Sequence, residues 1–80
     1  MNLTEPIYAY ILLTVALGKE YDIIEKAKSI QGVINARVVY GEYDVVIEVR
    51  VGSLRELDKV VNELRRFPEV IRTVTLIASS

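Results

Sequence analysis

Five consecutive residues near the middle of the chain combine types that can bind a polar ligand: Tyr40, Gly41, Glu42, Tyr43 and Asp44. An aspartate can accept backbone N–H bonds or bind an ammonium group, and a glycine leaves its own N–H accessible to a carboxylate. These groups together suit the zwitterionic head of an amino acid. Turn chemistry is the simpler interpretation of Gly41, but a tight turn does not require two flanking tyrosines.

Catalytic chemistry has little support elsewhere in the 80 residues. The chain contains neither histidine nor cysteine, which excludes Ser-His-Asp and Cys-His sets, thiolate metal sites and disulfides. The glycines are isolated, so the chain has no glycine-rich phosphate loop. Glu42 and Asp44 are paired acids, yet acids in a turn are usually only solvated, and no further oxygen ligands are spaced to complete a metal site. We therefore expect no enzyme activity, no metal and no cofactor.

Charge and hydropathy narrow the classes of partner. The net charge of −1 argues against direct DNA binding, which normally needs a basic surface. The basic residues of the two expected helices alternate with acidic ones, as on a solvated helix face. The longest uncharged run, residues 6–18, is too short to span a bilayer, and Glu5 does not fit a signal peptide. These observations predict a cytoplasmic protein with no membrane contact.

The loop must be positioned by strands on either side of it. The pattern predicts strands over residues 7–17, 33–40, 43–51 and 70–78, because these runs are rich in β-branched and aromatic residues. Apolar residues at every odd position of 43–51 give the alternation of a strand with one buried face.

Two helices are expected between these strands. Residues 19–31 have apolar residues at helical spacing, and Gly32 is expected to be the C′ residue of that helix. Ser53 and Glu56 form a capping box for a second helix, which Pro68 ends. The order β-α-β-β-α-β predicts an α+β, ferredoxin-like fold: one four-stranded antiparallel sheet with both helices on one face and the first and third strands in its centre.

The first strand is apolar on both sides, although two helices can cover only one face of a sheet. Tyr8, Tyr10 and Leu12 lie opposite the side that begins with Ile7, and Val74 and Leu76 give the last strand a similar surface. An exposed apolar sheet face of this size usually marks an interface. We therefore expect these five residues to pack against a second copy of the chain. A strand-rich composition by itself is the alternative explanation, because folded surfaces carry many apolar atoms.

The order and spacing of these segments resemble the C-terminal regulatory (RAM) domain of the Lrp/AsnC regulators. The resemblance rests on Ala9-Tyr10-Ile11-Leu12, Gly32-Val33, the Gly41-x-Tyr43-Asp44 motif and Glu69-Val70, with Thr73 and Thr75 in the last strand. Full-length members carry an N-terminal helix-turn-helix domain. Only residues 1–6 precede the first strand here, so the chain resembles the stand-alone form, a single effector-binding and oligomerisation domain over residues 1–80. Many members have aspartate where this chain has Glu42.

The resemblance implies a role and a site. Family dimers form by packing sheets face to face, assemble into rings, and bind amino-acid effectors between neighbouring dimers close to the glycine-containing loop. It implicates Gly41, Glu42, Tyr43 and Asp44, with Thr73 and Thr75 as further effector-binding candidates. The implied partners are an amino acid or similar metabolite, other copies of the chain, and full-length Lrp/AsnC regulators through which transcription would be modulated. A purely structural assembly protein and a small dimeric monooxygenase of the ferredoxin-like class are the alternatives.

Overall fold

The computed structural model describes residues 5–79, and the order of elements within them is the predicted one. The six elements are β1 (Ile7–Val15), α1 (Glu20–Lys28), β2 (Val33–Val38), β3 (Val45–Val51), α2 (Leu54–Arg66) and β4 (Val70–Ile77).

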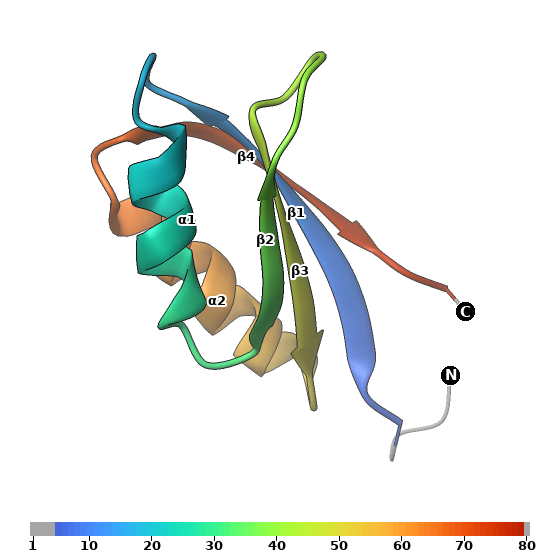
Figure 1. The fold of residues 1–80 in the computed structure, drawn as a ribbon. Coiled ribbons are helices and arrows are strands. Elements are labelled where there is room, and N and C mark those ends of the chain that lie inside the picture. The colour runs from blue at the N-terminus through green and yellow to red at the C-terminus, as the bar shows by residue number, and fades with distance from the viewer. Residues whose placement is uncertain (1–4, 80) are drawn as a thin grey trace.

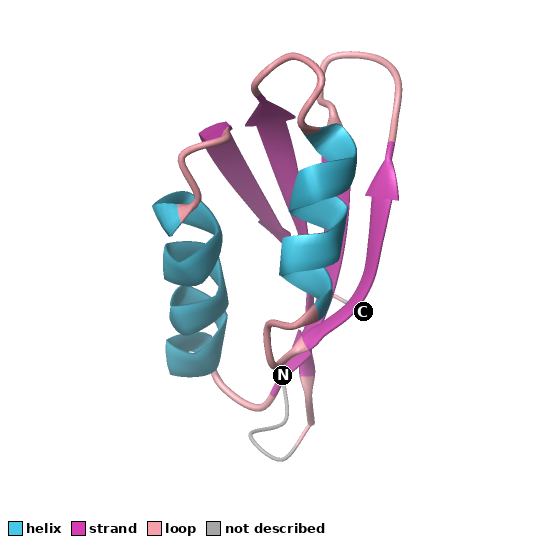
Figure 2. Cartoon of the chain, turned by 60° about the vertical axis from the view of Figure 1, so that its left-hand side comes forward, coloured by secondary structure: helices cyan, strands magenta, loops and turns pink. Residues whose placement is uncertain are grey.

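The four strands form one antiparallel sheet in the order β2-β3-β1-β4, with β1 and β3 in its centre as predicted. Both helices lie on the same side of the sheet, and no element of the described residues covers the other side (Figures 1 and 2). The chain therefore has the ferredoxin-like α+β fold.

The core lies between the sheet and the helices. Alternate residues of β1 and β3 point into it, because successive side chains of a strand face opposite sides of the sheet. Ile11 and Ile47 are cross-strand partners and are fully buried, as are Ile23 of α1 and Leu64 of α2. The alternate residues of β1, which begin with Tyr8, point to the side of the sheet without helices. The strand is therefore apolar both toward the core and toward this second side.

Helix α2 begins where its capping residues predict. The Ser53 hydroxyl accepts a hydrogen bond from the backbone N–H of Glu56 at 3.2 Å. The Glu56 carboxylate accepts from the N–H of Gly52 at 2.8 Å, one residue earlier than in a standard capping box. The helix ends at Arg66, and Phe67 takes an extended conformation because Pro68 follows it.

Helix α1 is shorter than the predicted 19–31. It ends at Lys28, and Ser29 to Gly32 form turns in which the N–H of Ile30 donates to the carbonyl of Ala27. Ile30 is buried at helical spacing, but it reaches the core from this turn. Gly32 has the expected positive φ (+101°), yet it lies beyond the Ser29 C-cap and is not the C′ residue.

The strands are also shorter than predicted, because apolar residue types continue past the points where backbone pairing stops. Leu17 and Tyr40 lie beyond the ends of β1 and β2 and are almost wholly exposed, at 97% and 100%. β3 begins at Val45 rather than Tyr43, and β4 ends at Ile77 rather than Ala78. Within residues 5–79, no helix has the length and apolar character needed to cross a membrane.

Candidate functional site

The hairpin between β2 and β3 carries the candidate loop. It is closed by the N–H of Val39, which donates to the carbonyl of Asp44 at 2.9 Å. Gly41 has a φ of +136°, and a Cβ placed on it would meet no atom within 4 Å. The loop projects beyond the end of the sheet, next to the β1–α1 connection (Figure 1). Its residues are therefore accessible to a ligand or to a neighbouring subunit.

Asp44 is the base of this loop and is tied to the central strand. Its N–H donates to the carbonyl of Leu13 at 2.9 Å, and its carboxylate Oδ2 accepts from the N–H of Val15 at 2.8 Å. The sequence left two roles open for Asp44, acceptance of a backbone N–H bond and binding of an ammonium group. The structure shows acceptance of a backbone N–H bond.

The other loop residues keep their polar groups available. Gly41 and Glu42 are exposed and Tyr43 is half-buried. Among residues 5–79, neither the Glu42 carboxylate nor the Tyr43 hydroxyl has a hydrogen-bond partner. The loop thus offers backbone amides, one carboxylate and one phenol at its surface.

Thr73 and Thr75 lie away from the loop within a single chain. Both are on the edge strand β4, paired with Leu13 and Ile11, so they share the helix-bearing side of the sheet. The central strands β1 and β3 lie between β4 and β2. Strand β1 therefore separates these threonines from Asp44 at the base of the loop, and Leu13 of β1 pairs with Thr73 on one edge and accepts from the Asp44 N–H on the other.

The five predicted interface residues do lie together, on the side of the sheet without helices. Tyr10 pairs with Leu76 and Leu12 pairs with Val74, so these side chains point the same way as Tyr8. Tyr8, Tyr10 and Leu76 are 45%, 40% and 51% exposed. We call the surface formed by Tyr8, Tyr10, Leu12, Val74 and Leu76 the open sheet face.

Residues of β3 border the open sheet face, although they were not among the predicted interface residues. Val46 is the partner of Leu12, Glu48 of Tyr10 and Arg50 of Tyr8. The Arg50 guanidinium lies 5.9 Å from the centre of the Tyr8 ring, within reach of a cation–π contact. The even positions of the predicted strand 43–51 were the signal that could have identified them.

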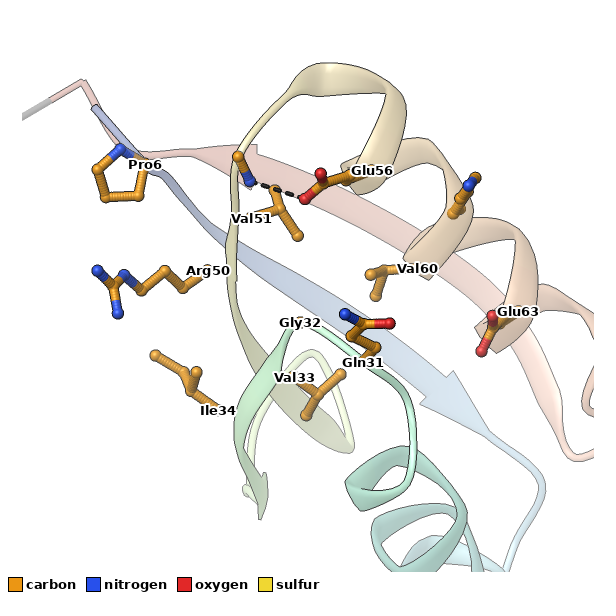
Figure 3. A pocket seen from close by; sticks show the side chains of 12 residues that line it. Pro6, Gln31, Gly32, Val33, Ile34, Arg50, Val51, Glu56, Val60 and Glu63 are labelled. Carbon is orange, nitrogen blue, oxygen red and sulfur yellow. Dashed lines mark hydrogen bonds between the residues drawn. The ribbon is translucent and has the colours of Figure 1, made fainter. Parts of the chain in front are cut away.

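A groove of about 610 Å³ lies at the other end of the sheet, between the α1–β2 turn and α2 (Figure 3). Val33, Val51 and Val60 contribute apolar surface, and Gln31 and Glu63 lie at its border (Figure 3). The groove is open to solvent, and it includes none of the predicted site residues. Its lining comes from four separate segments of the chain, so no local sequence pattern indicates it.

A second polar connection joins α1 to the turn between α2 and β4. The Lys26 ammonium group contacts Glu69 Oε2 at 2.6 Å and lies 5.3 Å from the centre of the Phe67 ring. The hydrogen bond from Lys26 is the main reason why the pKa of Glu69 is lowered below its ordinary value. The backbone carbonyl of Glu69 also accepts from the N–H of Ala16 at 2.8 Å. This connection fixes α1 and the end of β1 to the α2–β4 turn.

Metal chemistry has no site in the described part of the chain. Residues 5–79 contain no group of three or more His, Cys, Asp or Glu side chains that could hold an ion. The described residues form a ferredoxin-like module with an exposed polar loop and an apolar sheet face that carries no helix.

The chain belongs to the Lrp/AsnC ligand-binding domain family, whose model matches residues 8–80. Among solved structures, it is similar to the protein PHS023 from Pyrococcus horikoshii, with 40% identity and a TM-score of 0.85. That match covers 92% of this chain and 90% of the other.

Among curated proteins, the chain is 34% identical over 58 residues to an HTH-type transcriptional regulator, PF0250, from Pyrococcus furiosus. The match covers 71% of this chain but only 39% of the regulator, so the chain spans about two-fifths of that relative's length. A solved complex of the transcriptional regulator NMB0573 from Neisseria meningitidis with L-methionine has the same fold. It has a TM-score of 0.82 at 14% identity and covers 92% of this chain and 50% of the other.

Proposed function

We propose that the chain is a regulatory module that binds an amino acid or a similar small metabolite where subunits meet. It acts on transcription indirectly, by forming oligomers or by assembling with full-length Lrp/AsnC regulators. The role is non-enzymatic and places the protein in the cytoplasm. The supporting observation is the Gly41–Tyr43 segment, where the Glu42 carboxylate and the Tyr43 hydroxyl have no hydrogen-bond partner among residues 5–79 of a ligand-binding domain.

The open sheet face supports the assembly part of this proposal. Large apolar side chains on β1 and β4 are left without a covering element in a single chain. A second copy that presents the same face would remove this surface from water, at about 25 cal/mol for each Å² of apolar area buried. Stacked sheets of this kind leave their hairpin loops at the border of the dimer, where a further subunit can meet them.

A single chain leaves the ligand site incomplete, which favours an interface. Strand β1 lies between Asp44, at the base of the loop, and the threonines of β4. A neighbouring subunit can bring its own threonines or backbone groups to the loop. The negative charge of Glu42 would then sit close to the ligand and favour effectors with a positive group.

Isothermal titration calorimetry against the twenty amino acids tests the ligand part. We expect saturable binding of at least one, with a dissociation constant between about 1 μM and 1 mM. L-methionine is the first probe, because a transcriptional regulator with this fold, NMB0573, has been solved in complex with L-methionine. Tyr43→Ala should weaken the binding, because it removes the phenol at the end of the loop.

Tyr21→Ala is the matched control, since Tyr21 is an exposed tyrosine of α1 that lies outside the candidate loop. It should leave the heat of binding unchanged. Absence of binding to all twenty amino acids, in a protein that still forms oligomers, would contradict the ligand part and favour a purely structural assembly module.

A further inference from the structure

The end of β1 is held partly by a side-chain hydrogen bond in place of a main-chain one. The pairing between β1 and β3 ends with Leu13 and Val45. Two residues further along β1, a side chain replaces the main chain as the acceptor: the N–H of Val15 donates to Asp44 Oδ2. On the other edge of β1, the register with β4 shifts between Thr14 and Val15. The carboxylate therefore satisfies an amide at the point where the sheet becomes irregular.

The following residue is held from a different direction. The N–H of Ala16 donates to the carbonyl of Glu69, in the turn between α2 and β4. The amides of Val15, the last residue of β1, and of Ala16, which follows it, thus connect the end of this strand to the β2–β3 hairpin and to the α2–β4 turn. The side-chain bond of Asp44 thus adds to the strand pairing of β3 with β1 in holding the base of the hairpin.

Asp44 also controls the base of the hairpin itself. Its carbonyl accepts from Val39 and its N–H donates to Leu13, so it joins β2 and β1 through main-chain bonds. Tyr40, Gly41 and Glu42, at the far end of the hairpin, are exposed. The direction in which these residues point is consequently set at Asp44.

We propose that Asp44 is a positioning residue: its carboxylate holds the hairpin against Val15, and the ligand is contacted by Gly41, Glu42 and Tyr43. The ligand half of this inference rests on the proposed function, whereas the positioning half does not. A direct contact with a ligand ammonium group would instead require the negative charge of Asp44.

Two substitutions separate these roles. Asp44→Asn keeps an oxygen that accepts from Val15, but it removes the charge and places an NH2 group where a carboxylate oxygen was. Asp44→Ala removes both the acceptor and the charge. Positioning predicts that asparagine rescues the loop and alanine does not, whereas direct ammonium binding predicts that both variants fail.

The positioning half is tested without ligand, by hydrogen exchange of the Val15 amide measured by NMR. In Asp44→Ala we expect exchange of this amide to become faster by about tenfold or more, together with lower order parameters for Gly41 and Tyr43. In Asp44→Asn the exchange should stay within about threefold of the wild type. Asp58→Ala is the control, because Asp58 is exposed on α2 and should leave Val15 protected.

Unchanged protection of Val15 in Asp44→Ala, or loss of protection in Asp44→Asn, would overturn the positioning role. Should the alanine variant fail to fold, Asp44→Asn still decides the question, because its Val15 amide is either protected or not.

The ligand half is tested by titration of L-methionine, or of the tightest amino acid in the calorimetric panel. Affinity should change by less than about threefold in Asp44→Asn and fall by more than about tenfold in Asp44→Ala. A protected Val15 amide combined with lost binding in Asp44→Asn would show a direct contact and overturn the ligand half. A wild-type protein that binds no amino acid would contradict the proposed function, and the exchange measurement would still decide the positioning role.

Discussion

Gly32 shows how a single residue can be fixed by two independent constraints. Its φ of +101° is a backbone conformation that residues other than glycine rarely adopt. A Cβ placed on it would also lie 2.9 Å from Val51 Cγ1 and 3.3 Å from Val60 Cγ2, in the core beneath the groove. Gly18 is subject to the first constraint alone, because it has a φ of +81° with no atom within 4 Å of the added Cβ.

We expect Gly32→Ala to lower the free energy of unfolding by about 2–4 kcal/mol, from backbone strain and overpacking together. Gly18→Ala should lower it by about 1 kcal/mol, from backbone strain alone. Urea unfolding at one fixed protein concentration measures both, because association contributes to apparent stability. Equal losses in the two variants would contradict a role for the contacts with Val51 and Val60.

At the scale of elements, the ion pair between Lys26 and Glu69 joins helix α1 to the turn before β4. These residues are 43 positions apart in sequence, and the Glu69 side chain keeps only 18% of its surface exposed. The pKa of Glu69 is lowered because the hydrogen bond from Lys26 stabilises the charged carboxylate. A carboxyl group with a lowered pKa in the folded protein stabilises that state above its unfolded pKa, and the contribution is lost as the pH falls through the lowered value.

The melting temperature of Glu69→Gln should therefore fall below that of the wild type at neutral pH. The difference between the two should disappear as the solution is acidified, because the wild-type carboxylate becomes protonated and loses its charge. Scanning calorimetry as a function of pH measures this convergence. Glu63→Gln is the control, since Glu63 is exposed on α2 and forms no ion pair among residues 5–79. A constant difference between Glu69→Gln and wild type at every pH would show that the contact is not ionic.

At the scale of the whole molecule, the sheet has one face in the core and one face without cover. The open sheet face carries two tyrosines and three aliphatic residues, bordered by Glu48 and Arg50 of β3. Apolar centres with polar borders are common at interfaces between subunits. In a two-fold symmetric dimer, both subunits would contribute this same surface to the interface. Two-fold dimers are the commonest homo-oligomers.

We expect sedimentation velocity at micromolar concentration to show a dimer or a larger assembly for the wild-type protein. Leu12→Arg should shift it to the monomer, because burying an unpaired guanidinium in an apolar interface is strongly unfavourable. Leu54→Arg is the control, because Leu54 is also exposed but lies on α2, away from the open sheet face. Circular dichroism should show that both variants remain folded. A wild-type protein that sediments as a monomer would contradict the assembly proposal.

Local sequence patterns were sufficient to predict the order of elements, the central place of β1 and β3, the capping of α2 by Ser53 and the apolar character of β1 on both sides. These features depend on local periodicity and capping, which short segments carry independently of their neighbours. Strand and helix ends were less well determined, because Leu17, Ile30 and Tyr40 continue an apolar pattern beyond the last backbone pairing.

The hydrogen bonds and ion pairs between these elements became visible only in the folded arrangement. The bond from Val15 to Asp44, the ion pair of Lys26 with Glu69 and the separation of Thr73 and Thr75 from the loop all follow from strand order and register. Each joins or separates residues that are far apart in sequence, so no local pattern contains them. The same types of residue, in a different register, would have left the Asp44 carboxylate free for a ligand.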